Sequence, residues 1–417
     1  ELNFLITMDV PFKQHKGYDP LGDCGKGKCP ICARRNAIFK VKNTLQKEEF
    51  TSDSYSVFIG HYNYPNVNVG ILEPSQQYED SWLYDAPNYW AEQNFEIPQI
   101  VELRSSLINS RFKSNVLDVR KNTKFLDISK EVAMASKPVS IEINLYKKPA
   151  FRLNLDSHAL PMGPNAQLKQ VKLTENPKIH PKIEKVVSDT DLKAGEGLKI
   201  LYNNKFDENT LSKLLSIGNL GLKKNRKLVP TRFSITAVDS NIGNNLANEI
   251  KQYNQTGYLT YFGGYLGNYF LILFFPEIYS YELFETYAST FNNNKRFTTD
   301  FEPHEGRKQY AESTAGGFYA SRLAILEKLK DMKRQASVLV LRFITNEYNI
   351  PLGVFVVRES VRKALKNKPL EFSSRELMLK YAEILVKKKF NINIHDLLRN
   401  SKVLKDIKQQ TKLEKFV

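Results

Sequence analysis

The sequence contains little cysteine. Its 417 residues include three cysteines, and all three lie within the short stretch Cys24–Cys32. An odd, tightly clustered set is a poor framework for disulfides and a good one for a metal site. We therefore expect no disulfide scaffold and a reducing, cytoplasmic compartment.

Long apolar runs and the common catalytic motifs are also missing. The longest apolar run, Tyr269–Pro276, has the length of a buried strand, whereas a membrane helix needs about 20 apolar residues. The first residues lack a basic start, so we expect neither a signal peptide nor a membrane segment. The absence of a P-loop, GxGxxG, GxSxG and HExxH excludes the sites that those motifs build.

A basic surplus is the main compositional feature. Lysine and arginine number 61 against 45 acidic residues, which gives a formal net charge of +16 and a pI near 9.4. This surplus favours polyanionic partners, because each neutralised phosphate releases counterions. A basic chain with solvated lysines is the plainer alternative. The hydrophobic content of 41% is that of a folded protein, and the length predicts two domains or one large composite.

The pattern predicts an α+β fold with mixed or antiparallel sheets and packed helices. We also expect a small N-terminal zinc knuckle and a helical C-terminus with a flexible tail. The predicted segments are a zinc-binding segment at 1–50, a first domain at 51–200, a second α+β domain at 201–372, a helical region at 373–405 and a tail at 406–417.

Local periodicity predicts individual elements. Strands are expected at Val139–Tyr146, Phe233–Asp239, Ser337–Thr345 and Gly353–Ser360, and helices at Glu96–Phe112, Asn244–Asn254 and Ala315–Ala336. Other expectations are an irregular N-terminal segment 1–50, a long loop at Asp156–Gly197, a hairpin turning at Gly263 and Gly264, and a C-terminal helix capped by Ser373 with Glu376.

The cysteine cluster predicts a structural zinc site. Cys29 and Cys32 form a CxxC pair, and Cys24 stands five positions before Cys29. Tetrahedral zinc needs four ligands, and His15 is the nearest candidate for the fourth, ahead of Asp23. A water molecule in the fourth position would make the site catalytic, and free thiols are the plainer alternative.

The last residues predict a recognition peptide of the kind that docks on DNA sliding clamps. Gln410, Leu413 and Phe416 fit the pattern Q-x-x-aliphatic-x-x-aromatic, in which one tight helical turn places both apolar side chains on one side. Val417 stands where the pattern has a second aromatic, and the lost apolar area weakens the grip by about 1 kcal/mol or more. A chance match on a frayed helix is the alternative.

Charged residues inside apolar or Gly-rich segments are candidates for chemistry. A nuclease would hold Mg²⁺ with carboxylates from the set Asp156, Asp189, Asp191 and Asp239. A nucleotide-dependent transferase would place Arg104 and Arg232 on phosphates, with Glu312, Glu347 or Glu359 as the acidic partner. Structural ion pairs explain the same residues, as they do Arg342 and Arg358, and a solvated loop explains the aspartates.

Many segments together resemble one family. They are Ser56–Gly70, Trp82–Trp90, Val101–Ile108, Pro161–Lys169, Asn176–Gly197, Leu228–Gly243, Tyr265–Pro276 and Ala315–Ile344. These segments are similar to the Nre family of archaeal DNA repair proteins, and to its NreA branch in particular. The similarity runs from about residue 20 to about residue 365 and returns at the tail.

This resemblance implies a zinc-finger-like N-terminus, two characteristic domains and a role in repairing damaged DNA near the nucleoid. It also implies that the C-terminal peptide binds PCNA, the sliding clamp. The metal role falls on Cys24, Cys29 and Cys32, and the clamp role on Gln410, Leu413, Phe416 and Val417. The chain departs from the family pattern in having three cysteines instead of four, and His61 where others have arginine.

Two functional hypotheses follow. The first is a clamp-recruited repair factor that binds DNA, carries Zn²⁺ and has no membrane partner. The second is an enzyme acting on DNA or nucleotides, delivered by the same tail and using Mg²⁺ or a nucleotide. Its candidate catalytic residues are Arg104, Arg232, Asp239, Glu312 and Glu347.

Overall fold

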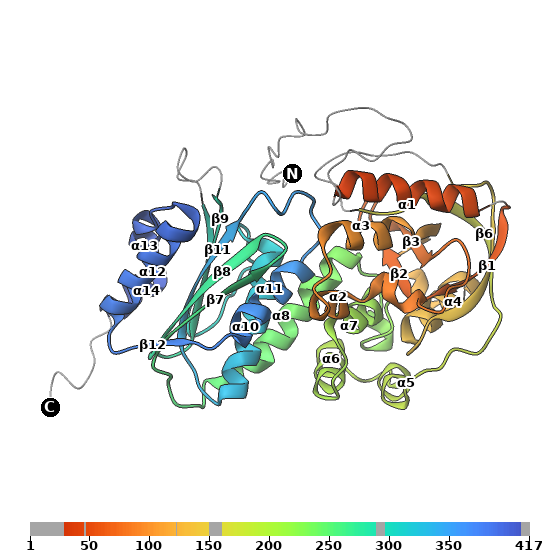
Figure 1. Ribbon diagram of the computed structural model, residues 1–417. Helices are drawn as coiled ribbons and strands as arrows, with labels where there is room; N and C mark the ends of the chain where they lie inside the picture. The colour runs from red at the N-terminus through yellow and green to blue at the C-terminus, as the bar shows by residue number, and fades with distance from the viewer. Residues whose placement is uncertain (1–28, 46, 122, 150–160, 289–296, 410–417) are drawn as a thin grey trace. The chain divides into compact units, whose positions relative to one another are not determined.

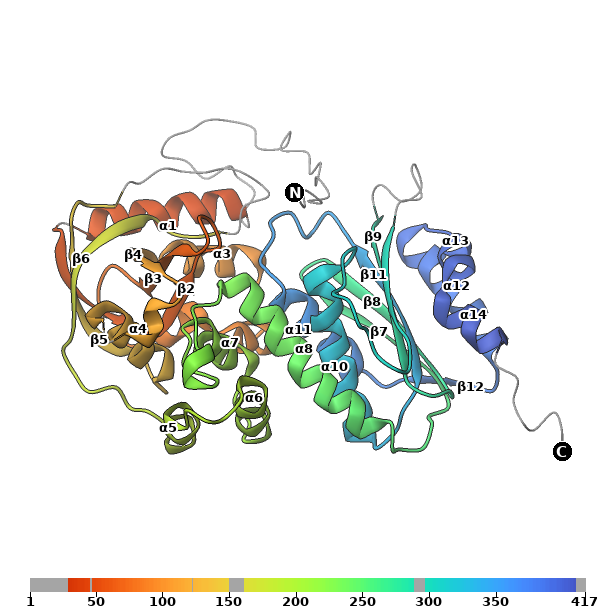
Figure 2. The same ribbon diagram turned by 180° about the vertical axis from the view of Figure 1, so that it is seen from behind.

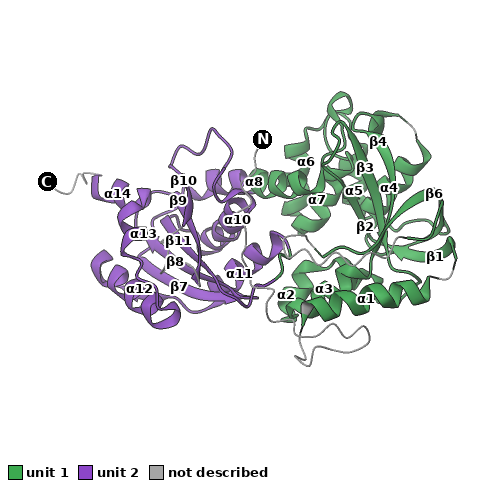
Figure 3. Ribbon diagram, turned by 90° about the horizontal axis from the view of Figure 1, so that it is seen from above, with its two compact units in different colours: residues 1–242, 350–352 green, residues 243–349, 353–417 purple. Residues whose placement is uncertain are grey.

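The computed structural model describes residues 29–45, 47–121, 123–149, 161–288 and 297–409. The chain forms two compact units (Figure 3). Unit 1 comprises residues 1–242 and 350–352, and unit 2 comprises residues 243–349 and 353–417. Each unit contains a mixed six-stranded sheet with packed helices, so the predicted α+β class is confirmed for the described residues. Helix α8, Thr231–Ile250, passes from one unit into the other.

Unit 1 is built around the sheet β1-β5-β6-β4-β3-β2 (Figure 1). Its strands are β1 (Glu49–Ser54), β2 (Ser56–Ile59), β3 (Asn66–Glu73), β4 (Ile108–Asn115), β5 (Val139–Leu145) and β6 (Asn165–Leu173). Its α-helices besides α8 are α1 (Pro30–Thr44), α2 (Pro87–Glu92), α3 (Ile97–Ser105), α4 (Lys124–Met134), α5 (Pro181–Ser188), α6 (Ala194–Asn203) and α7 (Glu208–Ser216), and its short 3-10 turns are η2 (Ser81–Asp85), η3 (Asp118–Arg120) and η4 (Lys223–Asn225).

The two ends of this sheet are joined by the chain itself. Strands β1 and β2 stand at opposite ends of the strand order, yet only Tyr55 separates them in sequence. The β1 side also reaches β3, because the Ser54 hydroxyl donates to the Leu72 carbonyl at 2.9 Å and the Ser52 hydroxyl to the Pro74 carbonyl at 2.7 Å. One bent strand therefore pairs with β5 through its first half and β3 through its second, and the sheet closes into a barrel.

A buried lysine holds the bend. Lys213 of α7 is 6% exposed, and its ammonium donates to the Tyr55 carbonyl at 3.0 Å. The same nitrogen lies 3.7 Å from the Tyr55 ring centroid and 3.7 Å from the Asp85 carboxylate. A buried ammonium is stable only with such partners, so Lys213 ties the bend to α7 and η2.

Alternate residues of the barrel strands fill its interior. Helix α4 packs against the same core through Leu126 and Val132. Fully burying each aliphatic side chain stabilises the fold by about 1.5–3 kcal/mol. The strand residues of this core include Val67, Val69, Ile71, Ile108, Ile141, Ile143, Leu168 and Val171.

Unit 2 is a layered structure around the sheet β10-β9-β11-β8-β7-β12 (Figure 2). Helices α10 and α11 lie on one face, with α10 beside α8, and α12, α13 and α14 lie on the other. The strands are β7 (Tyr258–Tyr265), β8 (Asn268–Phe275), β9 (Ser280–Tyr287), β10 (Thr298–Glu302), β11 (Ser337–Ile344) and β12 (Leu370–Phe372). The helices are α10 (Ala315–Met332), α11 (Phe355–Lys366), α12 (Arg375–Phe390), α13 (His395–Asn400) and α14 (Lys402–Gln409).

Two buried arginines of unit 2 are paired with glutamates. Arg322 is 3% exposed and its guanidinium lies 2.6 Å from Glu302. Arg342, a candidate site residue, bonds Glu285 at 2.5 Å and the Asn268 side-chain oxygen. Such pairs offset the desolvation of both charges, so these arginines hold elements together.

Two strands expected from β-branched residues are helical. Phe233–Asp239 lies inside α8, and most of Gly353–Ser360 lies in α11. Helix α8 buries Val238, Ile242, Leu246 and Ile250, a spacing of four residues that local alternation in the preceding stretch concealed. Burial on a helical face overrode the strand propensity of valine and isoleucine.

Other corrections concern boundaries and loops. The expected long loop 156–197 contains β6, α5 and the start of α6, and the segment expected to be irregular contains α1. The helix expected at 96–112 ends at Ser105, and β4 follows. The hairpin turns at Gly267 (φ +72°). Gly264 instead permits close strand contact, since a Cβ there would lie 2.3 Å from the Asn268 carbonyl oxygen.

The expected helix cap at the C-terminus is shifted by one residue. The N-cap of α12 is Ser374, whose side chain accepts a hydrogen bond from the Leu377 amide, and not Ser373. The expected flexible tail lies outside the described residues. Among those that are described, no helix is both long and apolar enough to cross a membrane.

A buried carboxyl group lies at one end of the barrel. Glu73 is fully buried at the end of β3, and it accepts a hydrogen bond from the Ser110 hydroxyl. Burial raises the pKa of Glu73 well above its usual value, and the Ser110 bond offsets only part of this rise. The folded protein therefore keeps this proton at pH values where the unfolded chain has released it.

Glu73→Gln is expected to flatten the pH dependence of stability. Unfolding of the wild type releases the Glu73 proton, so its free energy of unfolding falls as pH rises from the ordinary carboxyl pKa towards the raised one. The fall is at most about 1.4 kcal/mol per pH unit. Urea unfolding of both proteins between pH 5 and pH 8 measures the difference, which should grow with pH. Parallel curves would contradict the assignment.

Candidate nucleic-acid interface

The turn between β2 and β3 carries two exposed tyrosines. It is held by backbone bonds from the Gly60 amide to the Asn68 carbonyl and from the Asn66 amide to the Asn63 carbonyl, both 2.8 Å. Tyr62 is 73% exposed and Tyr64 is 56% exposed. Two exposed rings on one short turn form a small surface patch, and patches of this kind mark sites where partners bind.

One flank of this turn is basic and concave. A pocket of about 580 Å³ lies between the turn and the segments after β4 and η4. Arg120 is anchored there, since its guanidinium Nε donates to the Arg226 carbonyl at 2.8 Å, and the Leu228 amide bonds the Val116 carbonyl at 2.9 Å. The lining residues are Tyr64, Pro65, Asn115, Val116, Leu117, Arg120, Asn225 and Lys227.

The other flank is the start of α8. The Thr231 hydroxyl accepts a bond from the Ile59 amide at 2.9 Å, which fixes the helix against β2. Arg232 then lies 3.4 Å from the His61 ring nitrogen Nε2, and the exposed Phe233 follows it. Burial, and secondly the Arg232 charge, lower the pKa of His61. His61 is therefore neutral at neutral pH, and the positive charge at this flank belongs to Arg232.

The exposed rings and the cations of the turn and its two flanks, six residues in all, form what we call the basic aromatic face. Among the described residues, its three cations form no ion pair with a carboxylate. Unpaired cations attract phosphates, and exposed rings offer surfaces on which bases stack. The face comprises Tyr62, Tyr64, Arg120, Lys227, Arg232 and Phe233.

The predicted catalytic residues have different surroundings. Arg232 belongs to the basic aromatic face, whereas Arg104 stacks on the Trp90 ring at 5.2 Å and donates to the Leu352 carbonyl. Asp239 is buried within α8. The exposed Glu312 and Glu347 belong to unit 2, where Glu347 accepts a bond from the Tyr269 hydroxyl at 3.3 Å.

The remaining acidic candidates also have structural contacts. Glu359 pairs with Arg362 at 2.7 Å. Asp189 ends α5, and its carboxylate accepts a bond from the Asp191 amide at 3.0 Å. Asp156 lies outside the described residues. Within the described part of the chain, no three His, Cys, Asp or Glu side chains gather to hold a metal.

Two family models match the chain. The model for the N-terminal part of archaeal Nre covers residues 24–292, and the model for its C-terminal part covers residues 302–416. The chain belongs to the archaeal Nre family.

Curated Nre relatives match over most of their length. DNA repair protein NreA of Archaeoglobus fulgidus is 38% identical over 355 residues, covering 84% of this chain and 88% of the relative. NreA of Haloferax volcanii is 37% identical over 323 residues, covering 75% and 77%. DNA repair protein NreB of Archaeoglobus fulgidus is 33% identical over 393 residues, covering 93% and 96%. No solved structure matches this Nre chain.

The described part of the Nre cysteine cluster lies at a helix start. Cys29 is the N-cap of α1, and Cys32 follows in its first turn, buried at 5% exposure. Residues three apart on a helix lie on the same side, so this spacing suits two ligands of one metal. Cys24 and His15 lie outside the described residues, as do the clamp-peptide residues Gln410, Leu413, Phe416 and Val417.

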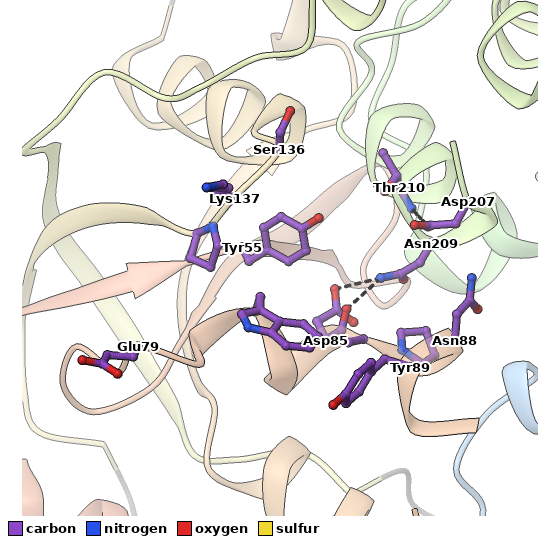
Figure 4. A pocket seen from close by; sticks show the side chains of 14 residues that line it. Tyr55, Glu79, Asp85, Asn88, Tyr89, Ser136, Lys137, Asp207, Asn209 and Thr210 are labelled. Carbon is purple, nitrogen blue, oxygen red and sulfur yellow. Dashed lines mark hydrogen bonds between the residues drawn. The ribbon is translucent and has the colours of Figure 1, made fainter. Parts of the chain in front are cut away.

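A second hollow in this Nre chain has a different character (Figure 4). This cavity of about 560 Å³ has aromatic walls from Tyr55, Trp82 and Tyr89. Asp85 also lines the cavity, and its carboxylate accepts a hydrogen bond from the Asn209 side chain at 3.1 Å. Further carboxylates from Glu79 and Asp207 disfavour a polyphosphate there, and none of the five predicted catalytic residues lines the cavity.

Most residues of the basic aromatic face were not among those predicted from the sequence. Only Arg232 was selected, for its place beside an apolar run. The run Lys223–Lys227 and the tyrosines at alternate positions 62 and 64 were visible signals. Nothing in the sequence indicated that they meet, because they lie about 160 positions apart and the pairing of Ile59 with Thr231 brings them together.

Proposed function

We propose that this chain is a DNA repair factor that binds DNA through the basic aromatic face of unit 1. Its Nre relatives carry the name DNA repair protein. The observation that supports DNA binding most directly is the meeting of unpaired Arg120, Lys227 and Arg232 with exposed Tyr62 and Tyr64. The net charge of +16 acts in the same direction, since it attracts polyanions over a longer range.

The proposal includes recruitment to the sliding clamp by Gln410–Val417. The preceding helix α14 is firmly attached to unit 2, because buried Glu282 of β9 accepts bonds from the Ser401 hydroxyl and from the Lys402 and Val403 amides at 2.6, 3.0 and 3.1 Å. A carboxylate at a helix N-terminus is favourable. The peptide thus follows a fixed helix that ends at Gln409.

We further propose a structural Zn²⁺ held by Cys24, Cys29 and Cys32, with His15 as the fourth ligand. The pair at the start of α1 supports this ligand set through its spacing and partial burial. Zinc would lock the chain before α1 to the helix start, where it contributes folding energy directly.

The DNA-binding proposal predicts a charge-dependent loss. Arg120→Ala with Lys227→Ala should lower DNA affinity roughly tenfold to a hundredfold at low salt and reduce the slope of log K against log salt by about 2. Fluorescence anisotropy between 50 and 300 mM salt measures both quantities. Lys387→Ala with Lys388→Ala removes the same charge from exposed positions in α12 and is the control. Equal losses in both variants would mean that only net charge matters.

The clamp proposal predicts that a substitution in the C-terminal peptide weakens clamp binding and leaves DNA binding unchanged. Phe416→Ala should weaken binding to the sliding clamp at least tenfold, because the peptide loses its larger apolar anchor. Calorimetry with purified clamp measures the affinity, with Glu414→Ala as a control outside the pattern. DNA affinity should not change. A Phe416→Ala protein that binds the clamp like the wild type would remove the basis for this assignment.

The zinc proposal predicts one zinc ion per chain by mass spectrometry of metals. Cys29→Ser and Cys32→Ser should each lose it and lower the melting temperature, because metal-binding energy is folding energy here. His15→Ala tests the fourth ligand. Metal-free wild-type protein with three titratable thiols and an unchanged melting temperature on chelation would refute the site.

A further inference from the structure

The barrel of unit 1 has a specific topology. Counting β1 and β2 as one bent strand, the order around the barrel is β1/β2, β3, β4, β6, β5 and back to β1/β2. In chain order this is 1-2-3-5-4-1. All neighbours are antiparallel except β4 and β6, the third and fifth strands, which are parallel.

The connection between the third and fourth strands is also that of a Greek-key barrel with one helix. Helix α4 lies between the third and fourth strands and packs against the barrel core. A five-stranded Greek-key barrel of this order is an OB fold, whose second and third strands and first and fourth loops commonly bind oligonucleotides. Here the second and third strands are β3 and β4, and the first loop is the tyrosine turn, residues 60–65.

We infer that unit 1 contains an OB-fold barrel that binds single-stranded DNA across the outer face of β3 and β4, with Tyr62 and Tyr64 stacking on unpaired bases. The inference rests on the proposed DNA binding and names its substrate class and path. It predicts a ligand that runs from the basic aromatic face across the strands.

The outer face of β3 and β4 is polar and basic. Val67 and Val69 point into the barrel, so Asn68 between them points outward, and it pairs with the exposed Lys113. Arg111, also exposed, pairs with Gly70 on one side and Gln167 on the other. In the described part of the chain, neither Arg111 nor Lys113 forms an ion pair, so both cations are available to phosphates.

An exposed aromatic also lies on the far side of this face. Tyr146 begins the connection between the fourth and fifth strands and is 59% exposed. Its amide donates to the Gln167 carbonyl at 3.0 Å, and Gln167 is the strand neighbour of Arg111. Exposed rings therefore lie on both sides of the cationic strands, at the start of the fourth loop and in the first, the two loops with which OB folds bind oligonucleotides.

The exposed rings favour a single strand over a duplex. A duplex hides the faces of its bases, so Tyr62 and Tyr64 would gain little from it, whereas each unpaired base offers a face for stacking. Stacking is tolerant of sequence, which suits a repair factor that meets arbitrary DNA.

Paired titrations of full-length protein test the inference. Labelled oligo(dT) of about 12 nucleotides, within the usual span of one OB fold, is compared with a hairpin duplex and with oligo(U) at one salt concentration. We expect the single-stranded DNA to bind at least tenfold more tightly than the duplex. Tyr62→Ala with Tyr64→Ala should lose roughly tenfold or more of this affinity, and Tyr62→Phe with Tyr64→Phe should retain it because the rings remain.

A second pair of variants tests whether the DNA crosses the outer face of β3 and β4. Arg111→Ala with Lys113→Ala should weaken binding to oligo(dT) much more than Lys387→Ala with Lys388→Ala, which removes the same charge from exposed positions in α12. Circular dichroism and melting temperatures confirm that each variant is folded. An Arg111/Lys113 variant with wild-type affinity would overturn the assignment of the β3–β4 face.

The other outcomes separate this inference from the proposed function. Equal binding of duplex and single strand, with no loss on removing the tyrosine rings, overturns the inference and leaves DNA binding intact. Tighter binding of oligo(U) than of oligo(dT) also overturns it. A protein that binds none of the three probes overturns both.

Discussion

The bend at Tyr55 is the constraint on which unit 1 depends. A flat sheet with β1 and β2 at its ends would leave two open edges, and the bend lets one strand pair with both β3 and β5. Lys213 holds this bend by bonding the Tyr55 carbonyl and covering its ring. Closure then sets the direction of the turn after β2, which positions Tyr62 and Tyr64 beside the start of α8. The candidate interface is thus a consequence of barrel closure.

Positive charge has two distinct uses in this protein. In unit 2, Arg322 and Arg342 are buried and paired with glutamates, so they contribute to cohesion and offer nothing to a ligand. In unit 1, Arg120 and Arg232 are oriented by a backbone carbonyl and by neutral His61, which leaves their charge uncompensated. Net charge counts both kinds equally, whereas only the second kind is available to a polyanion, such as the DNA of the proposed function.

Periodic segments were predictable where local pattern and packing agree. The strands at Val139–Leu145 and Ser337–Ile344 and the helix Ala315–Met332 are confirmed. Phe233–Asp239 was mispredicted because its β-branched residues favour a strand locally, while burial every fourth residue along α8 favours a helix. Of the candidate site, only Arg232 was predicted. A contact between residues far apart in sequence leaves no periodic trace in either segment.

The sequence by itself determined the family, the basic surplus, the CxxC pair and the pattern of the C-terminal peptide, because these depend on residue identity and short spacing alone. Tertiary structure decided which charges are paired, that β1 to β6 close into a barrel, and that the tyrosine turn lies between Arg232 on one flank and Arg120 with Lys227 on the other. Strand register and helix docking arise from burial and hydrogen bonding summed over the whole unit, so no single segment encodes them.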